Sequence, residues 1–349
     1  VFVEGIIFIV LSLTNVREAI FDAIPLNLKK GVSVGIGIFI AFIGLQNAKL
    51  VIGNKSTLVS ITNFTKDFHT AGICSLLAVI GLLITVILYI KKVPGSILIG
   101  ILATWVIGML CQITGIYVPD FKTGYYSLFP TFAMTDFSKL GETFGKCFQY
   151  DLGKVGIFNF IAVVLSFLFV DLFDTLGTLV GVSTKAGMLD EEGKLPGIKP
   201  ALMADAVATT AGAVLGTSTV TTFVESSSGV AAGGRTGLTA VVSGFLFLIS
   251  TLFAPLFTAI PSFATAPALI MVGFLMFGAI SDIKFTDDNM TEPAYLCIIA
   301  MPLFYSISEG ISIGIISYVI LNVVCGKAKK ITPLMYVLAL LFILKYAVL

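Results

Sequence analysis

The chain has 349 residues, of which 57% are hydrophobic and only 12% are charged, and its mean hydropathy is +1.04. Soluble domains carry about 25% charged residues, so this composition excludes an ordinary soluble domain and predicts an all-α polytopic membrane protein. A net charge of +1 provides no basic surface for phosphates, so we expect no nucleic-acid partner.

Apolar runs follow one another along the whole chain, and each predicts a helix. Several hold fewer than the roughly 20 residues that cross a bilayer, and glycines interrupt others, which is typical of transporters with broken helices. The predicted segments are residues 1–14, 31–45, 71–90, 97–113, 157–182, 206–215, 238–256, 266–280, 294–307, 311–324 and 333–349.

The first run is shorter than a full span, and no basic region or small-residue cleavage site accompanies it. We therefore expect an N-terminally truncated chain that begins inside a helix, not a signal peptide. Two apolar segments each begin with the sequence Ala-Ile-Pro, the first at Ala23-Ile24-Pro25 and the second at Ala259-Ile260-Pro261, and similar residues follow in both. This repeat predicts that the missing part contained a counterpart of residues 171–235.

Basic residues gather in connections that we expect on the cytoplasmic side, and the long connection of residues 115–154 then faces outward. These basic residues are Arg17, Lys29, Lys30, Lys91, Lys92, Lys185, Lys194, Lys199, Lys284, Lys327, Lys329 and Lys330.

The five cysteines are scattered and show no CxxC spacing, and the single histidine lies in a polar connection. We expect the cysteines to be small buried hydrophobic residues. The sequence therefore predicts no disulfide, no metal site and no cofactor.

Acidic residues interrupt the apolar run of residues 157–182. Asp171 and Asp174 are spaced i, i+3, so they share one helix face, and Thr178 continues that face. A charged side chain at bilayer depth costs at least ~2.5 kcal/mol, so such residues are usually functional. The alternative is a structural pair that neutralises a cation, with Arg235 and the flanking lysines as the plausible partners, or that caps a neighbouring helix.

A β-branched polar run, residues 217–223, precedes Glu225 between two apolar segments. Irregular backbone at membrane depth persists only where protein encloses it or where it lines a cavity. We expect a short strand here, followed by a half-helix that begins near Glu225. An ordinary loop with a capping carboxylate is the alternative. Asp205 is expected to cap a helix or to make a cytoplasmic contact.

Three stretches, residues 43–48, 171–178 and 217–229, resemble the purine permease branch of the nucleobase–cation symporter (xanthine–uracil permease) superfamily, the AzgA-like hypoxanthine, guanine and adenine permeases. The resemblance covers the chain to about residue 330. It implies fourteen spans in two inverted repeats of seven, with a core and a gate domain and with a short strand and half-helix near the midplane. The first three spans would be missing.

On that scheme the chain divides into five parts. Residues 1–114 hold spans four to seven, residues 115–154 form the outward loop, and residues 155–258 hold core-domain spans eight to eleven. Residues 259–330 hold gate spans twelve to fourteen, and residues 331–349 form an extra apolar helix.

The resemblance also implies a substrate site. Glu225 matches the carboxylate that grips the nucleobase ring nitrogens, Asp174 matches the acidic position beside the substrate, and Asp171 is the second acid of that helix. Phe223 and Val224 match positions that line the site, and Thr178 falls where uracil-specific relatives carry a histidine. A buried carboxylate can accept two purine N–H bonds and exchange a proton, so all three acids are proton-coupling candidates.

The implied function is import of hypoxanthine, guanine or adenine by proton symport, without enzymatic activity, in the cell (plasma or inner) membrane. The expected partners are a purine nucleobase, a proton and the lipid bilayer, and the resemblance admits a homodimer. A uracil, xanthine or anion transporter of the same fold is the first alternative.

Two alternatives come from other classes of protein. An intramembrane aspartyl protease places its aspartates on different helices, one within a Gly-x-Gly-Asp pattern, and neither feature occurs here. A structural scaffold leaves three acids at bilayer depth unexplained.

Overall fold

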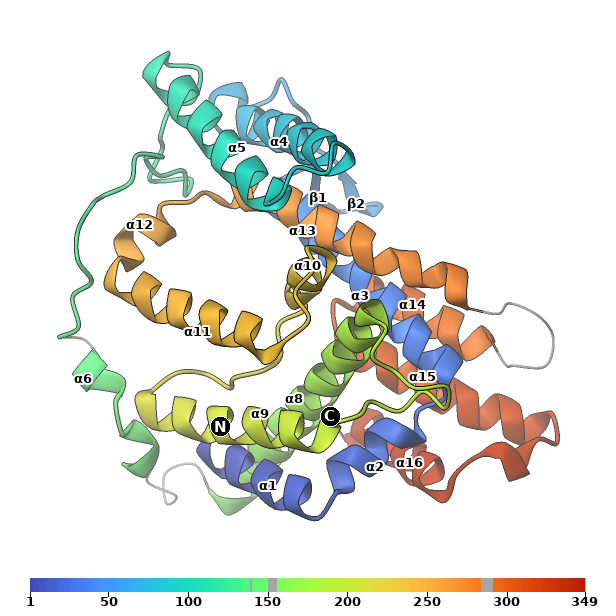
Figure 1. Cartoon of the computed structure of the whole chain (residues 1–349). Coiled ribbons are helices and arrows are strands. Elements are labelled where there is room, and N and C mark those ends of the chain that lie inside the picture. The colour runs from blue at the N-terminus through green and yellow to red at the C-terminus, as the bar shows by residue number, and fades with distance from the viewer. Residues whose placement is uncertain (139, 150–155, 284–290, 349) are drawn as a thin grey trace. The chain divides into compact units, whose positions relative to one another are not determined.

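The computed structural model describes residues 1–138, 140–149, 156–283 and 291–348, and it is mostly helical (Figure 1). The longer helices are α1 (Phe2–Leu13), α2 (Val16–Ala23), α3 (Leu26–Asn47), α4 (Ile73–Ile90), α5 (Ser96–Ile113), α8 (Ile157–Ala186), α9 (Ile198–Leu215), α11 (Gly237–Leu252), α13 (Ser262–Phe277), α14 (Glu292–Phe304), α15 (Ile307–Val324) and α16 (Pro333–Val348). The shorter elements are strands β1 (Val51–Asn54) and β2 (Leu58–Ile61), α6 (Leu140–Thr143), α10 (Ser226–Ala231), α12 (Ala254–Thr258), a π-helix (Phe68–Gly72) and 3₁₀ turns at Lys146–Phe148, Gly278–Asp282 and Ala328–Lys330.

Every predicted apolar segment falls on a helix. Among the described residues, seven helices are long and apolar enough to cross a membrane: Leu26–Asn47, Phe68–Ile90, Ser96–Ile113, Val163–Ala186, Ile198–Leu215, Ser262–Asp282 and Ile307–Val324. The polytopic helical prediction is therefore confirmed.

The repeat predicted from the two Ala-Ile-Pro patterns falls on matching elements. Pro25 directly precedes α3 and Pro261 directly precedes α13, positions that suit proline because the first amides of a helix have no intrahelical partner. A short helix precedes each of these prolines, α2 in the first case and α12 in the second. The order of short helix, proline and long helix thus occurs at both places, and the inverted repeat itself stays a prediction.

The chain divides into two compact units. Unit 1 comprises residues 1–38, 137–227 and 276–349, and unit 2 comprises residues 39–136 and 228–275. The division into five parts made from the sequence stays a prediction.

Unit 1 is built around two helix pairs, α1 beside α9 and α14 beside α15 (Figure 1). Gly5 of α1 permits the close approach to α9, because a Cβ there would lie 2.4 Å from the Thr210 hydroxyl oxygen. The C-terminal helix α16 packs on α15, and its Phe342 ring lies 4.6 Å from the Phe173 ring of α8. Glu309 of α15 binds both Lys345 and Tyr346 of α16.

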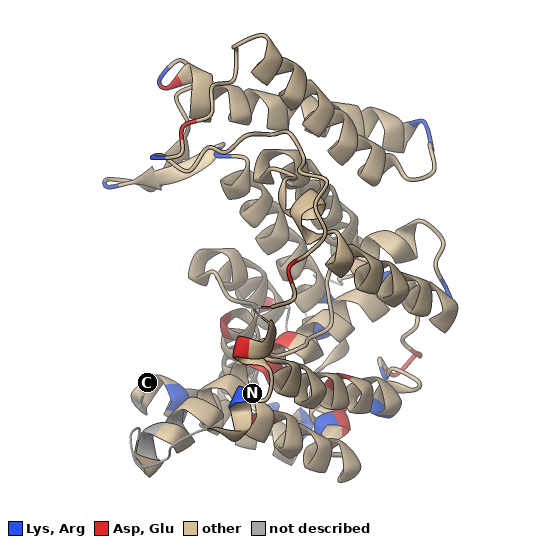
Figure 2. Cartoon of the chain, turned by 90° about the vertical axis from the view of Figure 1, so that its left-hand side faces the viewer, with Lys and Arg blue, Asp and Glu red and all other residues tan. Residues whose placement is uncertain are grey.

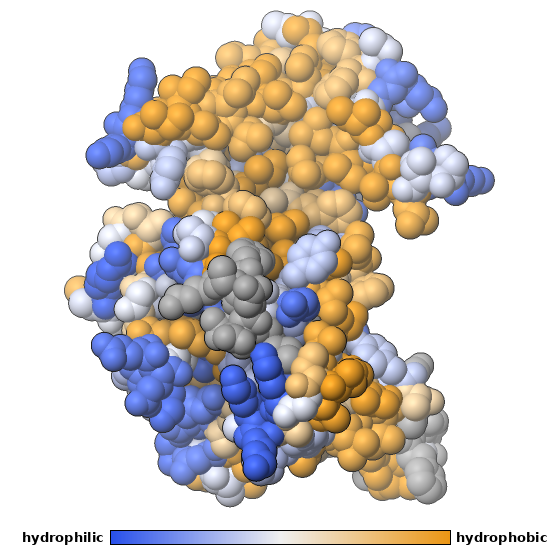
Figure 3. All heavy atoms as spheres, turned by 90° about the vertical axis from the view of Figure 1, so that its right-hand side faces the viewer, coloured by the Kyte–Doolittle hydropathy of each residue, from blue (hydrophilic) through white to orange (hydrophobic). Residues whose placement is uncertain are grey.

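In unit 2, α4 and α5 form a closely packed antiparallel hairpin. The Thr104 hydroxyl faces Gly81, and the Thr85 hydroxyl faces Gly100, so small residues let the two backbones approach. The outer sides of both helices expose large apolar residues, such as Leu83 and Leu98, and this part of the molecule is orange in Figure 3. That surface suits contact with lipid.

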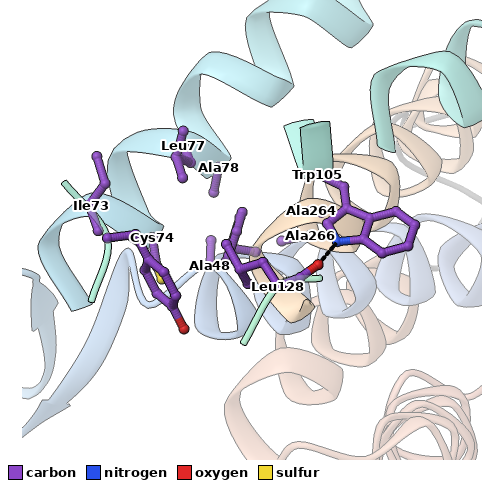
Figure 4. Packing of buried hydrophobic residues seen from close by; sticks show 11 residues of the cluster. Ala48, Ile73, Cys74, Leu77, Ala78, Trp105, Leu128, Ala264 and Ala266 are labelled. Atoms are coloured by element: carbon purple, nitrogen blue, oxygen red, sulfur yellow. Dashed lines mark hydrogen bonds between the residues drawn. The ribbon is translucent and has the colours of Figure 1, made fainter. Parts of the chain in front are cut away.

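Below this hairpin lies the hydrophobic core of unit 2 (Figure 4). Trp105 donates its indole N–H to the Leu128 carbonyl oxygen at 2.8 Å, which attaches the connection after α5 to the core. Tyr117 donates its hydroxyl hydrogen to the Tyr126 carbonyl oxygen at 2.7 Å. Burial raises the pKa of Tyr117, so the phenol stays protonated and keeps donating.

Three sequence-based expectations need correction or fall outside the described residues. Arg17 and Lys29 are not solvated connection residues, because both side chains are fully buried in unit 1. The Lys29 ammonium donates to the Gly193 carbonyl oxygen at 2.6 Å and lies 4.2 Å from the centre of the Phe21 ring. Lys284 lies outside the described residues.

The sequence predicted buried cysteines, but only some of the five are buried. Cys74 and Cys297 are buried, whereas Cys325 is exposed because it follows the last residue of α15. A two-stranded antiparallel hairpin, β1–β2, was not foreseen in the polar connection before α4.

Candidate functional site

The predicted acids lie on α8, and their environments differ. Asp171 is buried, and its carboxylate accepts a hydrogen bond from the Thr219 hydroxyl at 2.8 Å. Asp174 is half-buried and makes no hydrogen bond or ion pair within the described part of the chain. The Asp171 carboxylate therefore already has a hydrogen-bond donor from the protein. The Asp174 carboxylate can accept a hydrogen bond from a ligand.

Helix α9 leads directly into the second predicted motif. The helix ends at Gly216, whose φ of 88° lies in the left-handed region, and the Thr217 amide closes the end by donating to the Gly212 carbonyl oxygen. The backbone then continues as residues 217–223, before α10.

The strand predicted at residues 217–223 does not form, because this segment has no ladder partner among the described residues. Side chains from two helices hold it instead. Thr219 bonds to Asp171 of α8, and Thr221 bonds to Thr175 of α8 at 2.8 Å. On the α9 side, Thr209 donates to the Val220 carbonyl oxygen at 2.7 Å. The β-branched run is therefore an irregular segment held by hydroxyl groups.

Asp205 also differs from its prediction as a cap or cytoplasmic contact. Its carboxylate lies 2.7 Å from the Arg17 guanidinium nitrogen Nη2, and both side chains are buried. The other carboxylate oxygen accepts from Thr175 at 3.3 Å. Arg17 also donates to the Leu202 carbonyl oxygen at 3.0 Å and lies 4.3 Å from the centre of the Phe8 ring. Asp205 thus forms an ion pair with a cation from another helix, in the interior of unit 1.

Arg235, considered from the sequence as a partner for the acids, binds backbone instead. Its guanidinium donates to the carbonyl oxygens of Val230 and Gly234, close to it in the chain. These bonds stabilise the turn after α10.

The half-helix predicted near Glu225 is confirmed as α10, which begins at Ser226 and has six residues. Glu225 is exposed and directly precedes it. Phe223 exposes 60% of its surface, Val224 is buried, and Thr178 of α8 is buried. Phe223 and Glu225 therefore reach the protein surface, while Val224 and Thr178 pack inside the protein.

Sequence reasoning missed Arg17 as a member of this region, and it gave no individual role to Thr175, Thr219 and Thr221, which lie inside the predicted motifs. Thr175 stands four residues after Asp171, so the helical spacing that linked the acids could have included it. No local pattern could have linked Arg17 to Asp205, which lies 188 positions away.

Unit 2 contains a cavity of about 490 Å³ at the residues that follow α3 and α5 and precede α13. Lys49, Asn47, Tyr125 and Phe263 are among the residues that line it, and no acid belongs to this described lining. None of the predicted site residues contributes to it.

The structure is that of a polytopic helical protein, and sequence comparison gives its family. The chain matches the model of the Permease family, the xanthine/uracil permeases, over residues 1–340, and it belongs to that family. It is therefore a membrane permease and not an enzyme. The match does not support the N-terminal truncation expected from the sequence.

Curated relatives cover nearly the whole chain. The guanine/hypoxanthine permease PbuG of Bacillus subtilis is 44% identical over 346 residues, which is 99% of this chain and 74% of PbuG. The guanine/hypoxanthine permease PbuO of the same organism is 44% identical over 353 residues, covering 100% of this chain and 77% of PbuO. The adenine permease AdeP of Escherichia coli is 37% identical over 345 residues, covering 99% of this chain and 72% of AdeP.

Proposed function

We propose that this protein transports purine nucleobases across the cell membrane, as a secondary active transporter that couples uptake to protons. The names of its relatives support a purine substrate, since PbuG and PbuO are guanine/hypoxanthine permeases and AdeP is an adenine permease. The polar groups of the α8 helix and of the segment that ends at Glu225 supply the recognition chemistry.

The observation that carries this proposal is the attachment of the 217–223 segment to α8 through Thr219 and Asp171. It joins the helix that bears Asp174 to the segment that leads into Phe223 and Glu225. A purine has adjacent N–H groups on a flat ring, and an ionised carboxylate can accept two of them. The exposed Phe223 ring offers a face for stacking.

In this proposal Glu225 grips the ring nitrogens, Asp174 binds a second polar edge, and Asp171 supports the segment. Val224 contributes backbone groups, and Thr178 packs behind Asp174. Proton binding at Asp174 offsets the cost of burying its charge when the site closes, so proton and purine would enter together. The repeated helix order is consistent with two inverted repeats and alternating access.

Uptake of labelled nucleobases tests the proposal. Cells that lack their own purine permeases and express the full protein should accumulate hypoxanthine, guanine or adenine, and a protonophore should abolish the accumulation. Replacing sodium by choline should leave it unchanged. Accumulation of uracil or xanthine in place of these three would assign the protein to the alternative substrate class, and sodium dependence would contradict proton coupling.

An aspartate variant tests the site itself. We expect Asp174→Asn to weaken purine uptake by roughly 10- to 100-fold, since one hydrogen bond to a charged group contributes about 1.5–3 kcal/mol and each 1.4 kcal/mol is a factor of ten. Uptake equal to that of the parent protein at equal expression would remove Asp174 from the site.

A further inference from the structure

A chain of side chains in unit 1 connects Arg17 to the segment that precedes Glu225. The Arg17 guanidinium binds Asp205 at 2.7 Å, Asp205 lies 3.3 Å from the Thr175 hydroxyl, and Thr175 lies 2.8 Å from the Thr221 hydroxyl. Arg17 comes from α2, Asp205 from α9 and Thr175 from α8. Three helices and the irregular segment thus meet in one hydrogen-bonded series.

The direction of these bonds is fixed by chemistry. An ionised carboxylate only accepts hydrogen bonds, and a guanidinium only donates them. Asp205 therefore accepts from Arg17 on one oxygen and from Thr175 on the other. Because Thr175 has a single hydroxyl hydrogen, which it donates to Asp205, the bond between the two threonines must be donated by Thr221.

The series is one of three side-chain attachments of the segment among the described residues, beside the bonds of Thr219 to Asp171 and of Thr209 to the Val220 carbonyl oxygen. Arg17 and Thr175 are fully buried, so no water competes for their bonds, and the Phe8 ring and the Leu202 carbonyl hold the guanidinium in place. Within the described residues, the segment forms no backbone ladder. Its conformation therefore depends on side chains, and the Thr221 bond is the one that lies nearest to Phe223 and Glu225 in the chain.

We propose that Arg17, Asp205, Thr175 and Thr221 are positioning residues that hold the 217–223 segment, and through it Phe223 and Glu225, in the geometry that binds a purine. This role rests on the proposed function. None of the four needs to touch the substrate. The Arg17 guanidinium binds one oxygen of Asp205, the other oxygen orients the Thr175 hydroxyl, and Thr175 in turn accepts from Thr221.

Hydroxyl-to-methyl variants test the proposal without leaving a buried charge. We expect Thr175→Val and Thr221→Val each to raise the KM for hypoxanthine by about three- to tenfold, with Vmax within about twofold of the parent protein. The double variant should be no worse than Thr175→Val alone, because that variant already loses both the bond to Thr221 and the bond to Asp205. Thr210→Val is the matched control, since Thr210 bonds only to Ala206 of its own helix, and it should leave KM unchanged.

A spin label provides a readout that does not depend on transport. Ser218 is exposed within the segment and Ala211 is exposed on α9, so a label can be placed at either position as S218C or A211C, after replacement of the native cysteines. We expect Thr175→Val and Thr221→Val to increase the mobility of the label at 218 and to leave the label at 211 unchanged. Thr210→Val should leave the mobility of both labels unchanged.

The two readouts separate failure of this inference from failure of the proposed function. If the parent protein carries no purine, the proposed function fails, and the label at 218 still reports whether the segment is held. Additive effects of the two threonine variants on KM, or a label at 218 that keeps its mobility in both, would overturn the positioning role. Arg17→Lys adds a graded test, because an ammonium cannot reproduce the fork that binds Asp205 and Leu202 together.

Discussion

Both units bury hydroxyl groups, but among the described residues unit 1 alone also buries charged side chains. Among the described residues, every buried charged side chain belongs to unit 1, namely Glu4, Arg17, Lys29, Asp171 and Asp205. The buried polar residues of unit 2 are Thr62, Ser75, Thr85, Ser96 and Thr104. Figure 2 shows the charges of the α4–α5 region at helix ends and connections, with the helices themselves tan.

The partners of these groups differ in the same way. In unit 2, Thr85 and Thr104 bond to carbonyl oxygens of their own helices, so each is satisfied locally. In unit 1, Arg17, Asp171 and Asp205 bond to residues from other elements. A helix whose polar side chains bond to its own backbone can face lipid. Hydrogen bonds between different elements instead fix how those elements lie relative to one another. We therefore expect recognition chemistry in unit 1 and packing chemistry in unit 2.

The largest effect should come from removing a charge in unit 1. Arg17→Ala leaves Asp205 buried without its cation, which costs about 3–5 kcal/mol in comparable cases. We expect a marked loss of thermal stability of the detergent-purified protein, measured by size-exclusion chromatography after heating. Lys194→Ala, which breaks only the exposed pair with Glu192, is the control and should leave the melting temperature unchanged. Equal stability of Arg17→Ala and the parent would contradict the structural importance of the pair.

Some residues of the candidate site could be predicted from the sequence, and others could not because their partners lie far away in the chain. Asp171 and Asp174 were found because they interrupt an apolar run, and α10 was found because its serines follow Glu225. Arg17 was misread because a basic residue between two helices usually lies in a solvated connection. Its burial depends on Asp205, a partner far away in the chain, and hydropathy carries no signal of such a pair.

Hairpin β1–β2 and the irregular segment at 217–223 show that the β-propensity of single residues does not suffice to predict a strand. β-branched residues predicted a strand at 217–223, yet strands need a neighbouring ladder, and α8 and α9 supply side-chain hydroxyls and carboxylates instead. The true hairpin lies among lysines near Asn54, whose side chain accepts bonds from the turn residues Ser56 and Thr57.

A steric change in unit 2 should have an intermediate effect. In Gly81→Ala, the new Cβ would lie 2.1 Å from the Thr104 hydroxyl oxygen, so the α4–α5 hairpin must separate, at a cost of about 1–3 kcal/mol. We expect a lower melting temperature with the KM for hypoxanthine unchanged. Thr104→Ala should restore stability in the double variant. Gly244→Ala, where nothing lies within 4 Å, is the control. A change in KM with stability preserved would contradict the division of roles between the units.

The smallest effect should come from one neutral hydrogen bond in unit 2. Trp105→Phe removes the bond to the Leu128 carbonyl oxygen and should cost about 1 kcal/mol. We expect a small decrease in melting temperature and unchanged transport kinetics. Tyr89→Phe, at the exposed end of α4, serves as the aromatic control. A loss of transport in Trp105→Phe at normal stability would place recognition in unit 2 as well.

The central claim is that the carboxylate before α10 binds the purine. The most direct measurement is the uptake of labelled hypoxanthine by Glu225→Gln and by Glu292→Gln, an exposed acid in the first turn of α14 that serves as the matched control. We predict that Glu225→Gln reduces uptake by about 10- to 100-fold at equal expression and that Glu292→Gln has no effect. Uptake by Glu225→Gln at the level of the parent protein would contradict the account.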